Sequence, residues 1–323
     1  MLINDRIYGK VDIKDKVIEE LILSKPLLRL KKISQDGAPH FIQPIRSVTR
    51  FEHSVGVWYL SCKYKRPIEE QIACLLHDVP HTAFSHAIDF VVNDEKHEFH
   101  EKFTEEIIMK SEIPLILEKH KVDIKKVLNK KTFPLLENDL PDISFDRWDY
   151  FMRDGFAVNF LPQVLVGEFL ANIYLEKNNL YFKDIKLAST FAILFMSFSR
   201  LIWLDPTSHG SYFLVSEALK TALKNGCITQ DDFFTDDEIL MKKLRKINDK
   251  KINKLLARLT PGKEFVYAPE SEAEFFGPNK PRVVDPLVLQ KGRLTRISKL
   301  VPSLEYAFEE FAKNYKYLGV RKI

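Results

Sequence analysis

The sequence contains few cysteines, and their arrangement excludes a disulfide framework. Only Cys62, Cys74 and Cys227 are present among 323 residues; they form no CxxC pair, and an odd number leaves one unpaired. Cys74 lies within an apolar run, where a free cysteine behaves as a small hydrophobic residue. This usage is typical of a reducing compartment, so we expect a cytoplasmic location.

The sequence also lacks the features of exported and membrane proteins. Its first residues, MLINDRIYGKVDIKDKV, contain no apolar segment of the kind found in a signal peptide. No uninterrupted apolar run approaches the length of about 18 residues that indicates a transmembrane helix. We therefore expect a soluble protein with no membrane partner.

A large excess of one charge is absent as well. The chain has 49 Lys and Arg residues against 45 Asp and Glu residues, a net charge of +4. This excess is too small to indicate nucleic-acid binding by itself. A small polyanionic ligand needs only a local positive patch, so the total charge neither favours nor excludes one.

Glycine is scarce, with 11 residues, and apolar residues recur at helical rather than alternating spacing. We predict a mainly α fold, with an all-α helical domain at residues 1–228. Residues 229–323 begin with charged helix and continue with strand-like segments at 264–268 and 281–289, which predicts a smaller C-terminal α+β region. The predicted helices span residues 16–24, 27–33, 51–64, 68–78, 84–92, 100–110, 144–154, 187–203, 212–225, 236–259 and 304–316.

Prolines predict two interruptions of this helical pattern. Residues 110–137 are rich in lysine and contain Pro114 and Pro134, which predicts a surface excursion. Pro206 predicts distortion of any helix around it, because a proline inside a helix removes a backbone hydrogen bond.

A pair of adjacent polar residues, His77 and Asp78, ends the fully apolar run Ile72–Leu76. Burying an imidazole beside a carboxylate is costly unless each is hydrogen-bonded or bound to a metal. The pair also lies in a histidine-rich stretch, which favours a divalent metal site with Mn, Fe, Zn, Ni or Mg as candidate ions. Six of the nine histidines fall between residues 53 and 100, namely His53, His77, His81, His86, His97 and His100.

The predicted helix 144–154 has two distinct faces at about 100° per residue. Asp146, Asp149, Tyr150 and Arg153 share one arc, and the opposite side is apolar. This arrangement suits the wall of a cleft. The alternative is a solvated polar face with an i,i+4 ion pair between Asp149 and Arg153. The helical angle does not choose between the two aspartates as a metal ligand.

Four segments together resemble the HD-domain phosphohydrolases. They are RFEHSVG at 50–56, LLHDVPHTAFSHAIDF at 75–90, HE at 100–101 and FDRWDYFMRDGF at 145–156. Their order and content are most similar to the deoxynucleoside-triphosphate triphosphohydrolase branch, over about residues 29–200. The resemblance implies an HD-domain helical bundle, one divalent metal, a nucleotide substrate and a homo-oligomer.

The resemblance also implies roles for individual residues. It selects Asp146 over Asp149, and the implied metal ligands are His53, His77, Asp78 and Asp146. The implied active-site residues are His81, His86, Asp89 and His100, with Glu101 supporting the catalytic histidine. The implied substrate contacts are Arg50, Arg147 and Tyr150 at the phosphates, Gln35 and Asp154 near the sugar, and Arg200 as a further phosphate-binding arginine.

These residue types suit phosphoester hydrolysis. A divalent cation polarises a phosphoryl oxygen and lowers the pKa of bound water. Histidine exchanges a proton near neutral pH, and guanidinium groups neutralise phosphate charge. The sequence departs from the family around its nucleotide pocket, where Pro80 and Thr82 replace glycines and Ser208-His209-Gly210 stands in the neighbourhood of a Tyr and His cluster.

Three functions remain open at this point. The first is a metal-dependent (deoxy)nucleoside triphosphate triphosphohydrolase, with manganese as a candidate ion. The second is a phosphatase or phosphodiesterase acting on nucleoside monophosphates or signalling nucleotides. The third is a nucleic-acid-binding regulatory module. Its support is a basic run comprising Arg29, Lys31, Lys32, Arg46 and Arg50.

Overall fold

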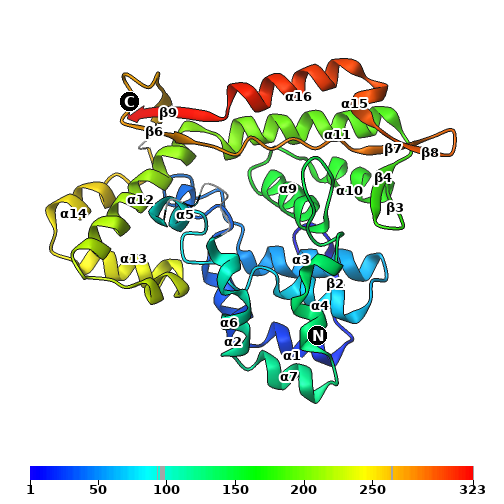
Figure 1. The fold of residues 1–323 in the computed structure, drawn as a ribbon, viewed down its shortest axis with the longest axis horizontal. Helices are drawn as coiled ribbons and strands as arrows, with labels where there is room; N and C mark the ends of the chain where they lie inside the picture. The colour runs from blue at the N-terminus through cyan, green and yellow to red at the C-terminus, as the bar shows by residue number, and fades with distance from the viewer. Residues whose placement is uncertain (93, 95–98, 263–264, 323) are drawn as a thin grey trace.

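The computed structural model describes residues 1–92, 94, 99–262 and 265–322. Within these ranges the chain forms sixteen α-helices and nine short β-strands (Figure 1). The prediction of a mainly α fold is therefore confirmed. The all-α description of the helical domain overstates it, because strands β1 to β4 lie before residue 228.

The bounds of the helices and strands are as follows. The helices are α1 (Lys16–Ile22), α2 (Lys25–Arg29), α3 (Arg50–Lys63), α4 (Ile68–Leu76), α5 (Ala87–Val92), α6 (Thr104–Met109), α7 (Ile113–Lys119), α8 (Ile124–Leu128), α9 (Phe145–Ala157), α10 (Gln163–Asn172), α11 (Ile185–Phe198), α12 (Pro206–Lys224), α13 (Asp237–Lys246), α14 (Lys250–Leu256), α15 (Ile297–Leu300) and α16 (Pro302–Asn314). The strands are β1 (Leu2–Asp5), β2 (Gly9–Asp12), β3 (Ile173–Glu176), β4 (Asn179–Phe182), β5 (Phe265–Tyr267), β6 (Phe275–Pro278), β7 (Leu287–Gln290), β8 (Arg293–Arg296) and β9 (Tyr317–Lys322).

Helices α3, α4 and α9 form the centre of the molecule, and their ends are set by local sequence signals. Helix α3 begins after Thr49, whose hydroxyl accepts the Glu52 backbone N–H while the Glu52 carboxylate accepts the Thr49 N–H. Helix α9 begins after Ser144, whose hydroxyl accepts the Arg147 N–H. These caps accept hydrogen bonds from backbone N–H groups that the first turn of a helix leaves unpaired. They therefore set the residues at which α3 and α9 begin.

The strands form three small sheets. Strands β1 and β2 make an antiparallel hairpin, and β5, β9 and β6 make a second sheet in that order. In the third sheet, of order β3-β4-β7-β8, β4 and β7 pair in parallel, with Tyr181 opposite Leu287. A strand before residue 228 therefore pairs directly with a strand after it.

Two large hydrophobic cores cross residue 228. The first contains helices α3, α4, α9 and α11 together with Val284, Val288 and Phe308 near the C-terminus. The second gathers α5, α12, α13 and α14 with buried residues of β5 and β9. Both cores therefore contain residues from before and after residue 228. The predicted division into domains 1–228 and 229–323 stays a proposal.

The two proline-based predictions have different outcomes. Most of residues 110–137 lie at the surface, although helices α7 and α8 bury Ile113, Leu117 and Val127 in the first core through their apolar faces. Pro206 does not distort a helix. It is the first residue of α12, where a missing N–H costs nothing, and the Asp205 carboxylate accepts the next two backbone N–H groups.

One helical segment, Ile185–Trp203, is long and apolar enough to cross a membrane by length and composition, with a mean hydropathy of 1.5. In the fold this segment lies between α9 and α16 (Figure 1). Phe191, Phe195 and Phe198 are buried in the first core, and the Phe191 ring stacks on Trp148. Of an 18-residue window of this segment, 33% is buried in the fold. The absence of a membrane partner stays an expectation.

Candidate metal centre and active-site cavity

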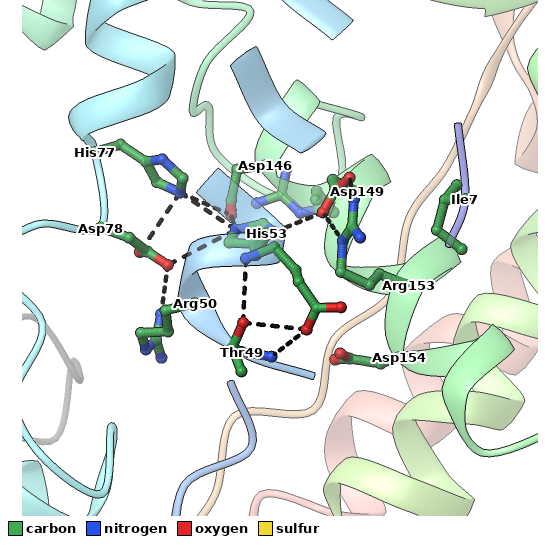
Figure 2. A network of polar contacts seen from close by, with 12 residues as sticks. Ile7, Thr49, Arg50, His53, His77, Asp78, Asp146, Asp149, Arg153 and Asp154 are labelled. Carbon is green, nitrogen blue, oxygen red and sulfur yellow. Dashed lines mark hydrogen bonds and ion pairs between the residues drawn. The ribbon is translucent and has the colours of Figure 1, made fainter. Parts of the chain in front are cut away.

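Three helices bring the four predicted metal ligands together. His53 lies on α3, His77 and Asp78 follow α4, and Asp146 lies in the first turn of α9 (Figure 2). Ligand atoms of His53, His77 and Asp146 all lie within 4.8 Å of one another. The two imidazole Nε2 atoms are 3.2 Å apart. Asp146 Oδ1 lies 2.9 Å from Nε2 of His53 and 3.6 Å from Nε2 of His77.

The orientation of each imidazole is fixed through its other nitrogen. His77 Nδ1 donates to the Cys74 carbonyl oxygen at 2.8 Å, and His53 Nδ1 donates to the Asp149 carboxylate at 2.8 Å. With the proton on Nδ1, the lone pair of Nε2 is left for a metal ion. Both rings are buried, so few other orientations are open to them.

Asp78 lies at the edge of this cluster. Its carboxylate is 3.5 Å from His77 Nε2 and 4.0 Å from His53 Nε2. Burial acts to raise the pKa of Asp78, but the guanidinium of Arg50, which donates to Oδ2 at 2.8 Å, and the neighbouring histidines hold that pKa well below its usual range. Asp78 is therefore a carboxylate and available as a ligand.

The chemistry of the donor set fits a divalent cation. Two imidazole nitrogens and two carboxylates are ligands that Mn, Fe, Zn and related ions accept. Burial acts to lower the pKa of His53, yet its hydrogen bonds with Asp146 and Asp149 and the charge of Asp78 raise this pKa to about 10. The same negative potential favours a bound cation at this point. The residues present therefore fit the divalent metal that the HD resemblance implies.

The centre opens into a cavity of about 830 Å³. Most of the predicted site residues line it, and they come from segments far apart in the sequence. The predicted residues at the cavity wall are Gln35, Arg50, Asp78, His81, His86, His100, Glu101, Asp146, Arg147, Tyr150 and Asp154. Asp89 stands behind His86, with Oδ2 3.0 Å from His86 Nδ1. His97 lies outside the residues that the structure describes.

Three histidines form a group beside Asp78. The rings of His81 and His100 stack with centroids 3.6 Å apart, and His86 meets His81 edge to face at 5.5 Å. Burial, together with the charges of His86 and Arg50, lowers the pKa of His100 to about 3, so this imidazole is neutral at pH 7. The pKa of His81 is lowered for the same main reason, burial. An imidazole with so low a pKa is a weak base, so both rings stay neutral at pH 7.

Two arginines differ from their predicted surroundings. Arg147 lines the cavity, but its guanidinium donates to the Asn138 side chain at 2.8 Å and to the Asp142 carbonyl. Arg200 is not among the residues that line the cavity, and its predicted role as a phosphate contact stays a prediction. Its exposed guanidinium lies 5.7 Å from the Tyr315 ring. Arg200 sits in a π-helical turn, Ser199–Trp203, whose wider spacing rotates side chains away from the α-helical phase.

The cavity also contains residues that the sequence did not reveal as part of the site. Arg46 appeared only as part of a basic run, and His209 only through a departure from the family pattern. Near the C-terminal end, Arg282 begins the segment RVVDPLV, which looks like a segment of related HD proteins, but its spacing does not relate it to the histidines. The additional lining residues include Asp36, Arg46, Phe90, Trp203, His209, Tyr212, Asn279, Lys280 and Arg282.

Asp149 and Arg153 form the predicted i,i+4 ion pair, but the alternative of a solvated face was wrong. Both side chains are fully buried, and Arg153 donates to both carboxylate oxygens of Asp149 at 2.8 and 2.9 Å. Asp146 is the aspartate whose carboxylate meets both imidazole Nε2 atoms. Asp149 meets only the Nδ1 side of His53.

Comparisons with known proteins agree with this geometry. A family model described as "HD domain" matches residues 50–154. The chain is 33% identical to the uncharacterized protein YdhJ of Bacillus subtilis over the full length of both. It is 29% identical to the metal-dependent phosphohydrolase cns2 of Cordyceps militaris, over 71% of this chain and 68% of that protein.

A more distant relative carries a more specific name. The deoxynucleoside triphosphate triphosphohydrolase SAMHD1 homolog of Dictyostelium discoideum is 28% identical over 48% of this chain and 36% of its own length. Among solved structures, a phosphohydrolase from Bacteroides thetaiotaomicron superposes with a TM-score of 0.72 at 17% identity, covering 99% of this chain and 98% of that one. At this identity the likeness shows a shared fold.

Proposed function

Because this chain belongs to the HD-domain family of metal-dependent phosphohydrolases, we propose that it hydrolyses nucleoside triphosphates or their deoxy forms, releasing inorganic triphosphate. Hydrolysis and dependence on a divalent metal come with the family. The substrate is the proposed part. Its support is one cavity in which the metal centre, cationic side chains and aromatic rings face the same space.

The cationic side chains suit the phosphate end of a nucleotide. Arg46, Arg50, Arg147, Lys280 and Arg282 line the same cavity as Asp78 and Asp146. Guanidinium forks match phosphate oxygens, and several of them are needed for the charge of a triphosphate. Arg50 already donates to Asp78, so it would place a phosphate next to the metal.

The aromatic side chains suit the base and sugar end. Phe90 stacks on Tyr212 with ring centroids 5.8 Å apart, and Trp203 meets Tyr150 edge to face at 5.2 Å. The Trp203 indole N–H donates to the Asp154 carboxyl group at 3.3 Å, and the second Asp154 oxygen is buried without a hydrogen-bond partner among the described residues. A sugar hydroxyl could donate to that oxygen.

The protein's own residues would position and protonate the reacting groups. His53, His77, Asp78 and Asp146 would hold the cation, which supplies polarisation of the phosphoryl oxygen and a lowered pKa for bound water. His86, oriented by Asp89, would exchange a proton near the leaving group. The stacked pair of His81 and His100 borders Asp78 and would exclude bulk water from that side.

A phosphatase acting on nucleoside monophosphates is the second candidate, and one observation favours it. Arg200 lies outside the cavity, and Arg147 is held by Asn138 and Asp142. Fewer of the predicted arginines therefore have a guanidinium group that is available to bind phosphate. A single phosphate needs fewer cationic partners than a triphosphate.

Product analysis separates the two candidates. Purified protein with Mn²⁺ would be incubated with a panel of nucleoside mono- and triphosphates, ribo and deoxy, and the products resolved by ion-pair chromatography. Free triphosphate is the expected product, with no release by His77→Ala. Orthophosphate from monophosphates alone would favour the second candidate. Turnover of no nucleotide, with tight salt-dependent binding to DNA or RNA, would favour the nucleic-acid module.

Three further sequence predictions are kept as proposals. We propose manganese as the activating ion, a homo-oligomeric state and a cytoplasmic location. The first can be tested by comparing Mn²⁺, Mg²⁺, Zn²⁺, Ni²⁺ and Fe²⁺ in the same assay, and the second by light scattering of the purified protein.

A further inference from the structure

The N-terminal hairpin and helix α9 share a buried polar network that ends at the metal centre. We propose that Asp149 is the positioning residue for His53, and that Arg153, Tyr8 and Asp5 hold Asp149 in place. The hairpin formed by β1 and β2 would thereby be part of the support of the metal centre. This inference depends on the metal centre of the proposed function and not on which nucleotide is cleaved.

Each oxygen of Asp149 accepts two hydrogen bonds. Oδ2 accepts from His53 Nδ1 at 2.8 Å and from Arg153 Nε at 2.8 Å. Oδ1 accepts from the Tyr8 hydroxyl at 2.7 Å and from Arg153 Nη2 at 2.9 Å. The carboxylate is fully buried and surrounded by donors, so only an ionised acid satisfies all four of them.

Arg153 connects this carboxylate to the hairpin. Its Nη1 donates to Asp5 Oδ2 at 2.9 Å, across 148 residues of sequence. The other Asp5 oxygen accepts the backbone N–H groups of Ile7 and Tyr8 at 2.8 and 2.9 Å, which fixes the turn between β1 and β2. Figure 2 shows Ile7 of this turn beside Arg153, with Asp149 between Arg153 and His53.

A second contact ties the same turn to the helix that carries His53. Arg6 donates to the Glu52 carboxylate through Nε at 2.8 Å, and Glu52 belongs to the cap of α3. The Tyr8 ring stacks on Tyr59 of α3 with centroids 4.6 Å apart. The turn therefore contacts both α3 and α9 at the level where His53 meets Asp149.

The consequence for the metal follows from the histidine tautomer. A carboxylate at Nδ1 keeps the proton on Nδ1 and the lone pair on Nε2, which faces His77 and Asp146. It also increases the basicity of the ligand. Loss of such an outer partner typically lowers metal affinity by about 10- to 100-fold.

An amide at position 149 cannot reproduce this arrangement. In one orientation its NH₂ group would face the Tyr8 hydroxyl, which can turn to accept, and Arg153 Nη2, which can only donate. In the other it would face Arg153 Nε and His53 Nδ1. The imidazole can relieve the second conflict by moving its proton to Nε2, and that tautomer cannot bind the metal through Nε2.

The test measures metal affinity, which is independent of the substrate. Metal-free wild type, Asp149→Asn and Tyr8→Phe would be titrated with Mn²⁺ by calorimetry. Glu70→Gln is the matched control: Glu70 is also a buried carboxylate in an i,i+4 pair with an arginine, Arg66, and it does not contact the metal centre. His77→Ala reports whether the centre binds metal at all.

We expect Asp149→Asn to bind Mn²⁺ about 10- to 100-fold more weakly and Tyr8→Phe less than about tenfold more weakly, with Glu70→Gln unchanged. In Zn²⁺-loaded, ¹⁵N-histidine-labelled protein, a protected Nδ1–H of His53 is expected in wild type and not in Asp149→Asn. Wild-type affinity in both Asp149→Asn and Tyr8→Phe would overturn the inference.

The controls keep the two possible failures separate. Unchanged Mn²⁺ affinity in His77→Ala would mean that the metal centre itself is wrong. Loss of binding in His77→Ala with wild-type binding in the Asp149 and Tyr8 variants would refute only the positioning role. If Asp149→Asn does not fold, Tyr8→Phe decides, because it removes one hydroxyl and keeps the ring that packs on Tyr59.

Discussion

Gly56 and Asp149 are in direct contact across the interface of α3 and α9. A Cβ atom at Gly56 would lie 1.9 Å from Asp149 Oδ1 and 2.3 Å from Arg153 Nη2. Both side chains are fully buried and hydrogen-bonded, so neither can move aside. The close approach of the two helices, on which the position of His53 depends, thus requires glycine at residue 56.

We therefore expect Gly56→Ala to lower the free energy of unfolding by about 1–3 kcal/mol or more, the usual range for overpacking a core. Chemical denaturation followed by circular dichroism measures this change. Gly167→Ala on α10 is the matched control, because a Cβ there meets nothing within 4 Å. That control should be neutral or stabilising by up to about 1 kcal/mol, since alanine favours helix. Equal stability of the two variants would contradict the account.

Arg282 and Arg200 allow a test of which arginine contacts the substrate. Arg282 lines the cavity, and its guanidinium lies 5.8 Å from the Trp203 ring. Arg200 lies outside, against Tyr315. Loss of one charge-assisted hydrogen bond to phosphate should reduce kcat/KM of Arg282→Ala by about 10- to 100-fold, mainly through KM. Arg200→Ala should keep the wild-type value, and a larger loss in Arg200→Ala than in Arg282→Ala would reverse the assignment.

Asp237 predicts a pH dependence of stability. Burial raises its pKa to about 6, although it accepts the backbone N–H groups of Ser34 and Phe84; the charge of Arg50 acts to lower this pKa and that of Asp236 to raise it. Because this pKa is higher in the folded than in the unfolded protein, Asp237 stabilises the fold when its carboxyl group is protonated. This stabilisation is fully present below the pKa of the unfolded state, about 3.9, and is lost as the pH rises through about 6.

Asp237→Asn removes this titration. Relative to the variant, wild type should lose up to about 3 kcal/mol of unfolding free energy between pH 4 and 7, since one pKa unit corresponds to about 1.4 kcal/mol. Urea unfolding of both proteins across this pH range measures the difference in slope. The amide also loses an acceptor, but that loss is constant with pH. Parallel pH profiles would rule out the titration of Asp237.

The helical fold and the His77-Asp78 pair could be predicted from local signals, whereas the full set of four metal ligands came from the family resemblance. The apolar run before His77 and the two faces of α9 follow from helical periodicity. The choice of Asp146 over Asp149 needed the family resemblance, since both acids lie on one arc of the helix. The structure brings ligand atoms of His53, His77 and Asp146 within 4.8 Å of one another, with Asp78 at the edge of this cluster.

The rest of the site depends on contacts between distant segments. The i,i+4 spacing of Asp149 and Arg153 is the same for a surface pair and a buried one. Contacts with distant residues such as Tyr8, 141 residues away from Asp149, determine which it is. Lys280 and Arg282 reach the cavity from the loop after β6, which no periodicity relates to the histidines. Arg200, assigned to the phosphates by the resemblance alone, lies in a π-helical turn and is not among the residues that line the cavity.

The central claim is that His53, His77, Asp78 and Asp146 hold one divalent metal that hydrolysis requires. Elemental analysis of purified wild type and His53→Ala, followed by phosphate-product assays on both with added Mn²⁺, tests it most directly. We expect about one equivalent of metal and Mn²⁺-dependent turnover in wild type, and neither in His53→Ala. Turnover by metal-free wild type in the presence of a chelator, or full metal content and activity in His53→Ala, would contradict it.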